Sequence, residues 1–256
     1  MTVTTEREGA RVTELAITER KPMKRRTLDI AFSIGGLVFS LLLALVGLIL
    51  NNQRSFADDY VHDQLADQQI SFPTTDKLAS DEELNTTLLE KLGTQTAVDA
   101  FVTEKGITSE ASSECLNAYA GQQMLTGKQA ECYAEDFIKL HALESSIVDG
   151  KSYTYATIGP VVTAARSAVT AAKEAGKPQE EIDGLQGKVD TLQRLRIDTL
   201  LRADTLRGLL LTSFGFSVFG ERAGQAFVVC LVAAGVLFLL SMPGSSTPLA
   251  PSGPRM

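Results

Sequence analysis

Two long runs of apolar residues dominate the hydropathy pattern of the chain. One covers residues 30–50, which are 21 residues without a charge, and the other covers residues 223–242, which are 20. A helix rises about 1.5 Å per residue, so each run is long enough to cross the roughly 30 Å of bilayer hydrocarbon. The pattern predicts two transmembrane helices, at residues 29–50 and 223–242.

Between these runs, apolar positions recur at helical spacing and strand signals are few. A capping box begins at Ser80, with Glu83 at the third helical position, and the leucines that follow stop at Gly93. Three further helices are expected: one ended by Gly106, one that contains Cys115 and Tyr119, and one over residues 130–144.

The clearest supersecondary signal lies later in the chain. Residues 163–175 are rich in alanine at helical spacing, and the sequence Gly176-Lys177-Pro178 suits a helix end followed by a new start. The next apolar stripe begins at Ile182 and can continue to about Leu211. The sequence therefore predicts an all-α fold, in which two transmembrane helices bracket an extracytoplasmic helical bundle with an antiparallel helical hairpin.

Residues 208–222 form an apolar stretch ahead of the second run. They include three phenylalanines and end in the charged pair Glu221-Arg222. Two interpretations remain open for this stretch: an interfacial segment at the outer leaflet, or a bent continuation of the long helix.

The charges that flank the first run set the orientation. Seven Lys or Arg precede it within residues 1–28, whereas Arg54 is the one basic residue close behind it. By the positive-inside rule, segment 1–28 and the tail 243–256 are cytoplasmic, and residues 51–222 form an extracytoplasmic domain at the plasma membrane. A cleaved signal peptide is the alternative, because Ser55-Phe56-Ala57 has the form of a cleavage site, but a 21-residue run exceeds a signal core and favours an anchor.

The charge of the predicted external domain limits its partners. The whole chain carries a net charge of −7, and residues 51–222 hold 26 Asp or Glu against 16 Lys or Arg, a difference of −10. Such a surface repels nucleic acid, so no nucleic-acid partner is expected. Glycines in both runs allow close helix contact, which is compatible with a homo-oligomer.

Residues suited to catalysis or metal binding are scarce. The chain has two histidines, His62 and His141, and each has a carboxylate three residues away. A di-iron bundle needs Glu-x-x-His motifs, which the sequence lacks, and no nucleophile or phosphate-loop motif occurs. We expect His141 to be half-buried with a hydrogen bond and His62 to be solvated. The sequence predicts no cofactor, no metal site and no catalytic residue.

The three cysteines have separate expected roles. Cys230 falls within the second run, where it suits apolar packing. On an ideal helix Cys132 lies half a turn from His141 and outside the apolar stripe, on the flank with Asp136. Outside the membrane thiols tend to be oxidised, so we predict a disulfide between Cys115 and Cys132.

Residues 127–144, GKQAECYAEDFIKLHALE, are followed by GKSYTYA and then by a Leu/Arg-rich helix that leads into the last apolar run. In these features the chain resembles, over residues 28–242, a group of uncharacterised actinobacterial membrane proteins. The resemblance implies an N-terminal span, an α-helical extracytoplasmic region and a C-terminal span. Some members carry the label of an aromatic ring-opening dioxygenase, a chemistry that uses a histidine-rich ferrous site.

Three functions are therefore compared. The leading hypothesis is a membrane-anchored interaction or accessory subunit of the cell envelope, without catalysis and with a protein partner. The first alternative is a receptor-like ligand-sensing domain that signals through a membrane partner. The second alternative is a metal-dependent oxygenase, for which the two histidines are too few.

Overall fold

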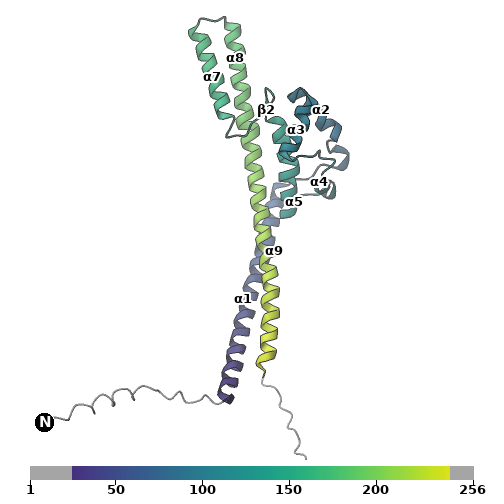
Figure 1. The fold of residues 1–256 in the computed structure, drawn as a ribbon, viewed down its shortest axis with the longest axis vertical. Coiled ribbons are helices and arrows are strands. Elements are labelled where there is room, and N and C mark those ends of the chain that lie inside the picture. The colour runs from purple at the N-terminus through teal and green to yellow at the C-terminus, as the bar shows by residue number, and fades with distance from the viewer. Residues whose placement is uncertain (1–24, 243–256) are drawn as a thin grey trace, which may run out of the picture. The chain divides into compact units, whose positions relative to one another are not determined.

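The computed structural model describes residues 25–242 and is almost entirely helical. Most of the predicted cytoplasmic segment 1–28 and all of the tail 243–256 lie outside the described residues. The described residues divide into two compact units, residues 25–48 with residues 227–242, and Ile49–Ala226, and each is described by itself. The helices and strands, most of them labelled in Figure 1, are α1 (Arg25–Gln68), η1 (Thr75–Lys77), α2 (Asp81–Leu92), α3 (Gln95–Lys105), α4 (Glu114–Tyr119), α5 (Gly127–Cys132), η2 (Tyr133–Ile138), α6 (Lys139–Ser145), β1 (Ile147–Val148), β2 (Lys151–Ser152), α7 (Gly159–Glu174), α8 (Gln179–Arg194), η3 (Leu195–Leu201) and α9 (Arg202–Ser241).

The first unit contains the apolar parts of α1 and α9. Both helices are long and apolar enough to cross a membrane, and their most apolar windows are each only 11% buried within the protein. The two helices touch where side chains are small. Ser40 Oγ donates a hydrogen bond to the carbonyl of Ala234 at 2.7 Å, and a Cβ on Gly47 would lie 3.5 Å from the Cβ of Cys230. Cys230 thus packs against the facing helix, as expected of a small apolar residue.

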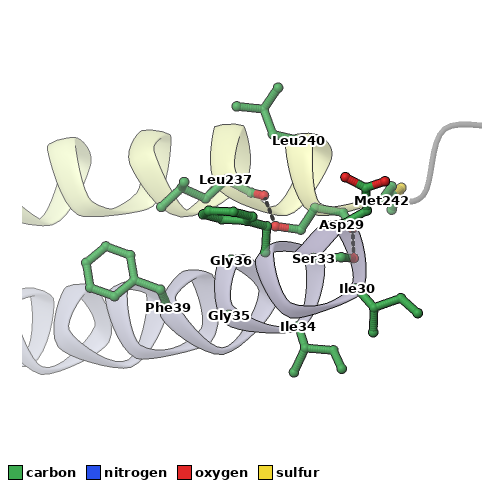
Figure 2. A pocket seen from close by; sticks show the side chains of 12 residues that line it. Asp29, Ile30, Ser33, Ile34, Gly35, Gly36, Phe39, Leu237, Leu240 and Met242 are labelled. Atoms are coloured by element: carbon green, nitrogen blue, oxygen red, sulfur yellow. Dashed lines mark hydrogen bonds between the residues drawn. The ribbon is translucent and has the colours of Figure 1, made fainter. Parts of the chain in front are cut away.

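An open hollow of about 800 Å³ lies between the two helices, with Asp29, Ser33 and Ser241 among its lining residues. Figure 2 shows most of the side chains that line it. Its hydroxyl groups bond within the helix pair. Ser33 Oγ donates to the carbonyl of Ser241, and Ser241 Oγ donates to the carbonyl of Leu237 (Figure 2). The polar atoms of the two serines are therefore satisfied inside an otherwise apolar pair of helices.

The second unit is built around four clusters of buried side chains. The largest joins the outer part of α1 to the segments that follow it, through Val61, Leu65, Phe72 and Leu116. Phe56 and Tyr60, which lie on the same helix as Val61, are not in this core but are 57% and 48% exposed.

Local capping signals locate α2 and α3 as the sequence predicts. Ser80 accepts a hydrogen bond from the backbone N–H of Glu83, and the Glu83 carboxylate accepts one from the N–H of Ser80. The helices end at Gly93 and Gly106, which have φ angles of 81° and 57°. Only glycine adopts this left-handed conformation at little cost, so both helix ends follow directly from the sequence.

A short turn with Gly176 at φ 63° connects α7 and α8. The two helices pack together through Val169, Ala172, Ile182 and Val189. From Gln179 the helical conformation continues to Ser241 and passes through the π-helical segment η3. Residues 208–222 are thus part of α9, which corresponds to the continuation alternative.

Candidate functional site: the helical segment from Gly127 to Ser145

The segment formed by α5, η2 and α6 carries most of the reactive side chains of the second unit. It begins at a capping box in which Thr126 accepts from the N–H of Gln129, while Gln129 Oε1 accepts from the N–H of Thr126. The helix then continues without interruption to Ser145. Local sequence therefore fixes the start of the segment that holds every group described below.

The structure brings the two predicted cysteines together. The Sγ atoms of Cys115 on α4 and Cys132 on α5 are 1.99 Å apart, and their Cα atoms are 6.0 Å apart, which is the geometry of a disulfide. Cys132 is buried and Cys115 is partly exposed. The bond joins two short helices, of six residues each, that would otherwise depend on packing alone.

Asp136 lies beside this disulfide. Its Oδ2 atom is 3.2 Å from Cys115 Sγ and accepts a hydrogen bond from Ser113 Oγ at 2.6 Å. Within the part of the chain that the structure describes, Cys115, Cys132 and Asp136 are the one cluster of three potential metal ligands. A metal binds thiolates, however, and two sulfur atoms that are bonded to each other are not thiolates. The oxidised cluster consequently retains one carboxylate ligand.

The middle of the segment is a π-helix, Tyr133–Ile138, with i→i+5 hydrogen bonds. Cys132 lies near Asp136, as expected, and Cys115 from α4 reaches it there. Cys132 is not outside the buried side of the helix, however, because it is 5% exposed and Ala134 and Ile138 are also buried. A rotation of 100° per residue does not describe the wider π-helical turn of Tyr133–Ile138. The core built around Phe72 and Leu116 also covers this flank.

His141 lies between two carboxylates. Its Nε2 atom is 2.6 Å from Oε1 of Glu110, and its Nδ1 atom is 3.3 Å from Oε2 of Glu144. The hydrogen bond to Glu144 raises the pKa of His141, and the charge of Glu110 adds to this effect against an opposing contribution from burial. Glu110 is 3% exposed, and its other oxygen accepts the N–H of Ala79 at 3.0 Å. The pair of His141 and Glu110 lies at the point where α6 meets the loop before α4.

An aromatic column continues from this pair along the helix. The ring of His141 meets Phe137 edge-on with centroids 4.6 Å apart, Phe137 lies 4.7 Å from Tyr133, and Tyr133 meets Phe72 at 5.3 Å. Burial raises the pKa of Tyr133, and the nearby Glu110 carboxylate adds to the shift. Tyr133 therefore stays neutral at physiological pH and acts as a packing residue.

A third contact attaches the segment to α9. Glu135 forms an ion pair with Arg207, and Lys139 lies 3.4 Å from the same carboxylate. Gly127 packs so closely against α9 that an added Cβ would overlap the side chain of Ser217. The charged and small residues of this segment thus position it against the long helix.

The structure does not bring the two histidines into one site. His62 lies on the outer part of α1 with its side chain 54% exposed, and its Nδ1 atom is 3.4 Å from a carboxylate oxygen of Asp63. Sequence reasoning paired His141 with Glu144 but missed Glu110. Glu110 lies in the connection between α3 and α4, where no periodic pattern signals burial. The one sign of its burial in the sequence is that two small residues, Ser109 and Ala111, flank it.

Comparisons with protein-family models, with curated proteins and with solved structures found no match.

Proposed function

We propose that this chain is an integral plasma-membrane protein whose residues 51–222 face the outside and bind a protein partner, as an interaction or accessory subunit without catalysis. The observation that supports an interaction role is a set of large apolar side chains that stay exposed on α1 and α9 outside the two predicted spans, namely Phe56, Tyr60, Leu209, Phe216 and Phe219. An exposed aromatic patch of this kind is typical of a binding surface.

The chemistry of the Gly127–Ser145 segment also favours a structural role. The two sulfur atoms are bonded to each other, His141 is paired with Glu110, and Glu135 is paired with Arg207. Each reactive group is used in a contact that connects this segment to another part of the domain. A metal-dependent oxygenase gains no support from this arrangement, because the two histidines lie apart and the cluster around Asp136 offers no free thiolate.

A pull-down of the full-length chain from native membranes in mild detergent tests this function. A stoichiometric protein, either a second copy or another membrane protein, is the expected result. A purified chain that turns over a substrate and loses that activity when His62 or His141 is replaced would contradict the proposal.

A second candidate function is ligand sensing, which a hollow of about 430 Å³ between α2 and α3 favours. Its lining residues include the buried Leu84 and Val98 and the carboxylates of Asp81 and Asp99. Hydrogen bonds from Ser109 and Ser112 lower the pKa of Asp81, so its carboxylate stays charged. Small-molecule sites commonly combine an apolar floor with a few polar groups in this size range.

Thermal unfolding of the full chain in the presence of small organic cations tests this second function. A concentration-dependent rise in the unfolding temperature that Asp99→Asn abolishes would support ligand sensing, whereas a flat response across such compounds would count against it.

A further inference from the structure

The disulfide between Cys115 and Cys132 is accessible at one of its two sulfur atoms. Cys115, on α4, is partly exposed, whereas Cys132, on α5, is 5% exposed and belongs to the largest cluster of buried side chains. A disulfide is reduced when a thiolate attacks one of its sulfur atoms. A thiolate from solvent therefore reaches this bond at Cys115 Sγ.

A carboxylate lies at this point of attack. The Oδ2 atom of Asp136 is 3.2 Å from Cys115 Sγ. A carboxylate oxygen of Asp136 and both sulfur atoms lie within 4.8 Å of one another. A thiolate that approaches Cys115 Sγ consequently comes close to the carboxylate as well.

The charge of Asp136 is not compensated by an ion pair among residues 25–242. Its hydrogen-bond donor is the neutral hydroxyl of Ser113, which is 2.6 Å from Oδ2. Lys139, one turn further along the helix, lies 3.4 Å from the carboxylate of Glu135, which also pairs with Arg207. Ser113 is 4% exposed, so its hydrogen bond holds the carboxylate beside the sulfur.

Two electrostatic effects of this carboxylate oppose the reduction of the bond. The attacking thiolate is negative and is repelled by the charge of Asp136. Attack on Cys115 also releases Cys132 as a thiolate, among buried apolar side chains and within 4.8 Å of the same carboxylate. Both the apolar surroundings and a neighbouring negative charge make a thiolate less stable.

We propose that Asp136 protects the Cys115–Cys132 disulfide against thiols, so that the bond is a permanent cross-link of the domain and not a redox switch. Reduction takes two electrons from one dithiol or from two monothiols. The first thiolate forms a mixed disulfide with Cys115 and displaces the Cys132 thiolate. The second attacks the outer sulfur of the mixed disulfide and displaces the Cys115 thiolate, and each displaced thiolate takes up a proton. Asp136 slows the first of these steps, whichever partner the domain binds.

Reduction by three small thiols of different charge tests this role. The full chain with Cys230→Ser is placed in an uncharged detergent and treated with mercaptoethanesulfonate, which is anionic, with mercaptoethanol, which is neutral, or with cysteamine, which is cationic. The released thiols are alkylated and counted by mass spectrometry, and each rate is divided by the fraction of the reagent that is a thiolate. We expect cysteamine to react fastest with this parent chain and mercaptoethanesulfonate slowest.

Asp136→Asn removes the charge and keeps an oxygen that can accept from Ser113. It is expected to raise the rate constant for mercaptoethanol by about 5-fold, the factor for two unit charges about 4 Å apart in water. The increase should be larger for mercaptoethanesulfonate and smaller for cysteamine. Glu90→Gln is the matched control, because Glu90 is an exposed carboxylate on α2 outside the cluster and its loss changes the net charge equally. Its three rate constants should equal those of the parent.

The ratio of the rate constants separates a charge effect from a loss of structure. A looser domain would expose the bond to every reagent alike, so an increase by one common factor in Asp136→Asn would overturn the proposal. Unchanged rate constants in Asp136→Asn would overturn it too, as would a parent chain that reacts equally with the anionic and the cationic thiol. The pull-down from native membranes tests the proposed interaction function separately.

Discussion

The Nε2 atom of His141 lies 2.6 Å from Oε1 of Glu110, a carboxylate that is 3% exposed. The hydrogen bond to Glu144 and the charge of Glu110 raise the pKa of His141 above its ordinary value of 6.5. A raised folded-state pKa contributes stability that is complete below the unfolded-state pKa and is lost as the pH rises through the folded-state pKa. We expect the free energy of unfolding of the full chain in detergent to be larger at pH 6 than at pH 8.

Two histidine variants isolate this effect. His141→Gln is expected to remove the part of the pH dependence between pH 6 and pH 8, since glutamine does not titrate there. His62→Gln is the matched control, because His62 is exposed beside Asp63 on α1, and it should keep the dependence of the native chain. An identical dependence in the native chain and in His141→Gln would show that the pair does not titrate as described.

The disulfide between Cys115 and Cys132 closes a loop with a sequence separation of 17 residues. Cys115→Ser is expected to lower the free energy of unfolding by about 3 kcal/mol, the loop-closure value for this length in the chain-entropy model. Cys230→Ser is the control and should change stability little, because that thiol lies in the apolar unit and forms no such bond. Mass spectrometry of a non-reduced tryptic digest checks the bond directly. Alkylated free thiols at both positions, in protein from intact cells, would contradict it.

The helix boundaries of the second unit were predictable because they depend on neighbouring residues. The Ser80 and Glu83 capping box and the left-handed glycines Gly93 and Gly106 are local signals, and each acts where the sequence places it. The two long apolar helices were predictable for a similar reason, since their length and hydropathy are read directly from the chain.

The candidate site was predictable only where the relevant pair is close in sequence. His141 and Glu144 are three residues apart on one helix, whereas Glu110 reaches His141 from 31 residues away through a loop without periodicity. The burial of Cys132 was not predictable either, because it depends on a π-helical turn and on side chains from Phe72 and Leu116 that cover it. Contacts of this kind are set by packing between segments, which a helical wheel does not contain.

Gly127 and Gly187 form a matched pair for testing the packing of α5 against α9. A Cβ on Gly127 would overlap Ser217 and lie 3.2 Å from the Cα of Phe214, so Gly127→Ala is expected to destabilise the domain by about 1–3 kcal/mol through overpacking. A Cβ on Gly187, within α8, meets no atom of the described residues within 4 Å. Gly187→Ala should therefore stabilise the domain by about 0.5–1 kcal/mol, because alanine loses less backbone entropy in a helix.

Denaturant unfolding of the two full-length variants measures both values. The two variants are expected to change the free energy of unfolding in opposite directions. A general sensitivity to alanine would change it in the same direction in both. Destabilisation by Gly187→Ala equal to that of Gly127→Ala would show that the close contact with α9 is not what requires glycine at position 127.

Gly35 and Gly36 are adjacent residues of α1 with different surroundings in the apolar unit (Figure 2). A Cβ on Gly36 would overlap the hydroxyl of Ser241 on the facing helix, whereas one on Gly35 meets no described atom within 4 Å. Gly36→Val is consequently expected to push the two helices apart, and Gly35→Val is expected to leave them in contact.

The readout is oxidative cross-linking between Ser40→Cys and Ala234→Cys in a Cys230→Ser background, since Ser40 already bonds to the backbone of Ala234. The helix contact is supported if Gly36→Val abolishes the cross-link and Gly35→Val retains it. Added volume on α1 would then separate the helices only on the face that carries Gly36. Equal cross-linking in the two variants would show that Gly36 does not set the distance between the helices.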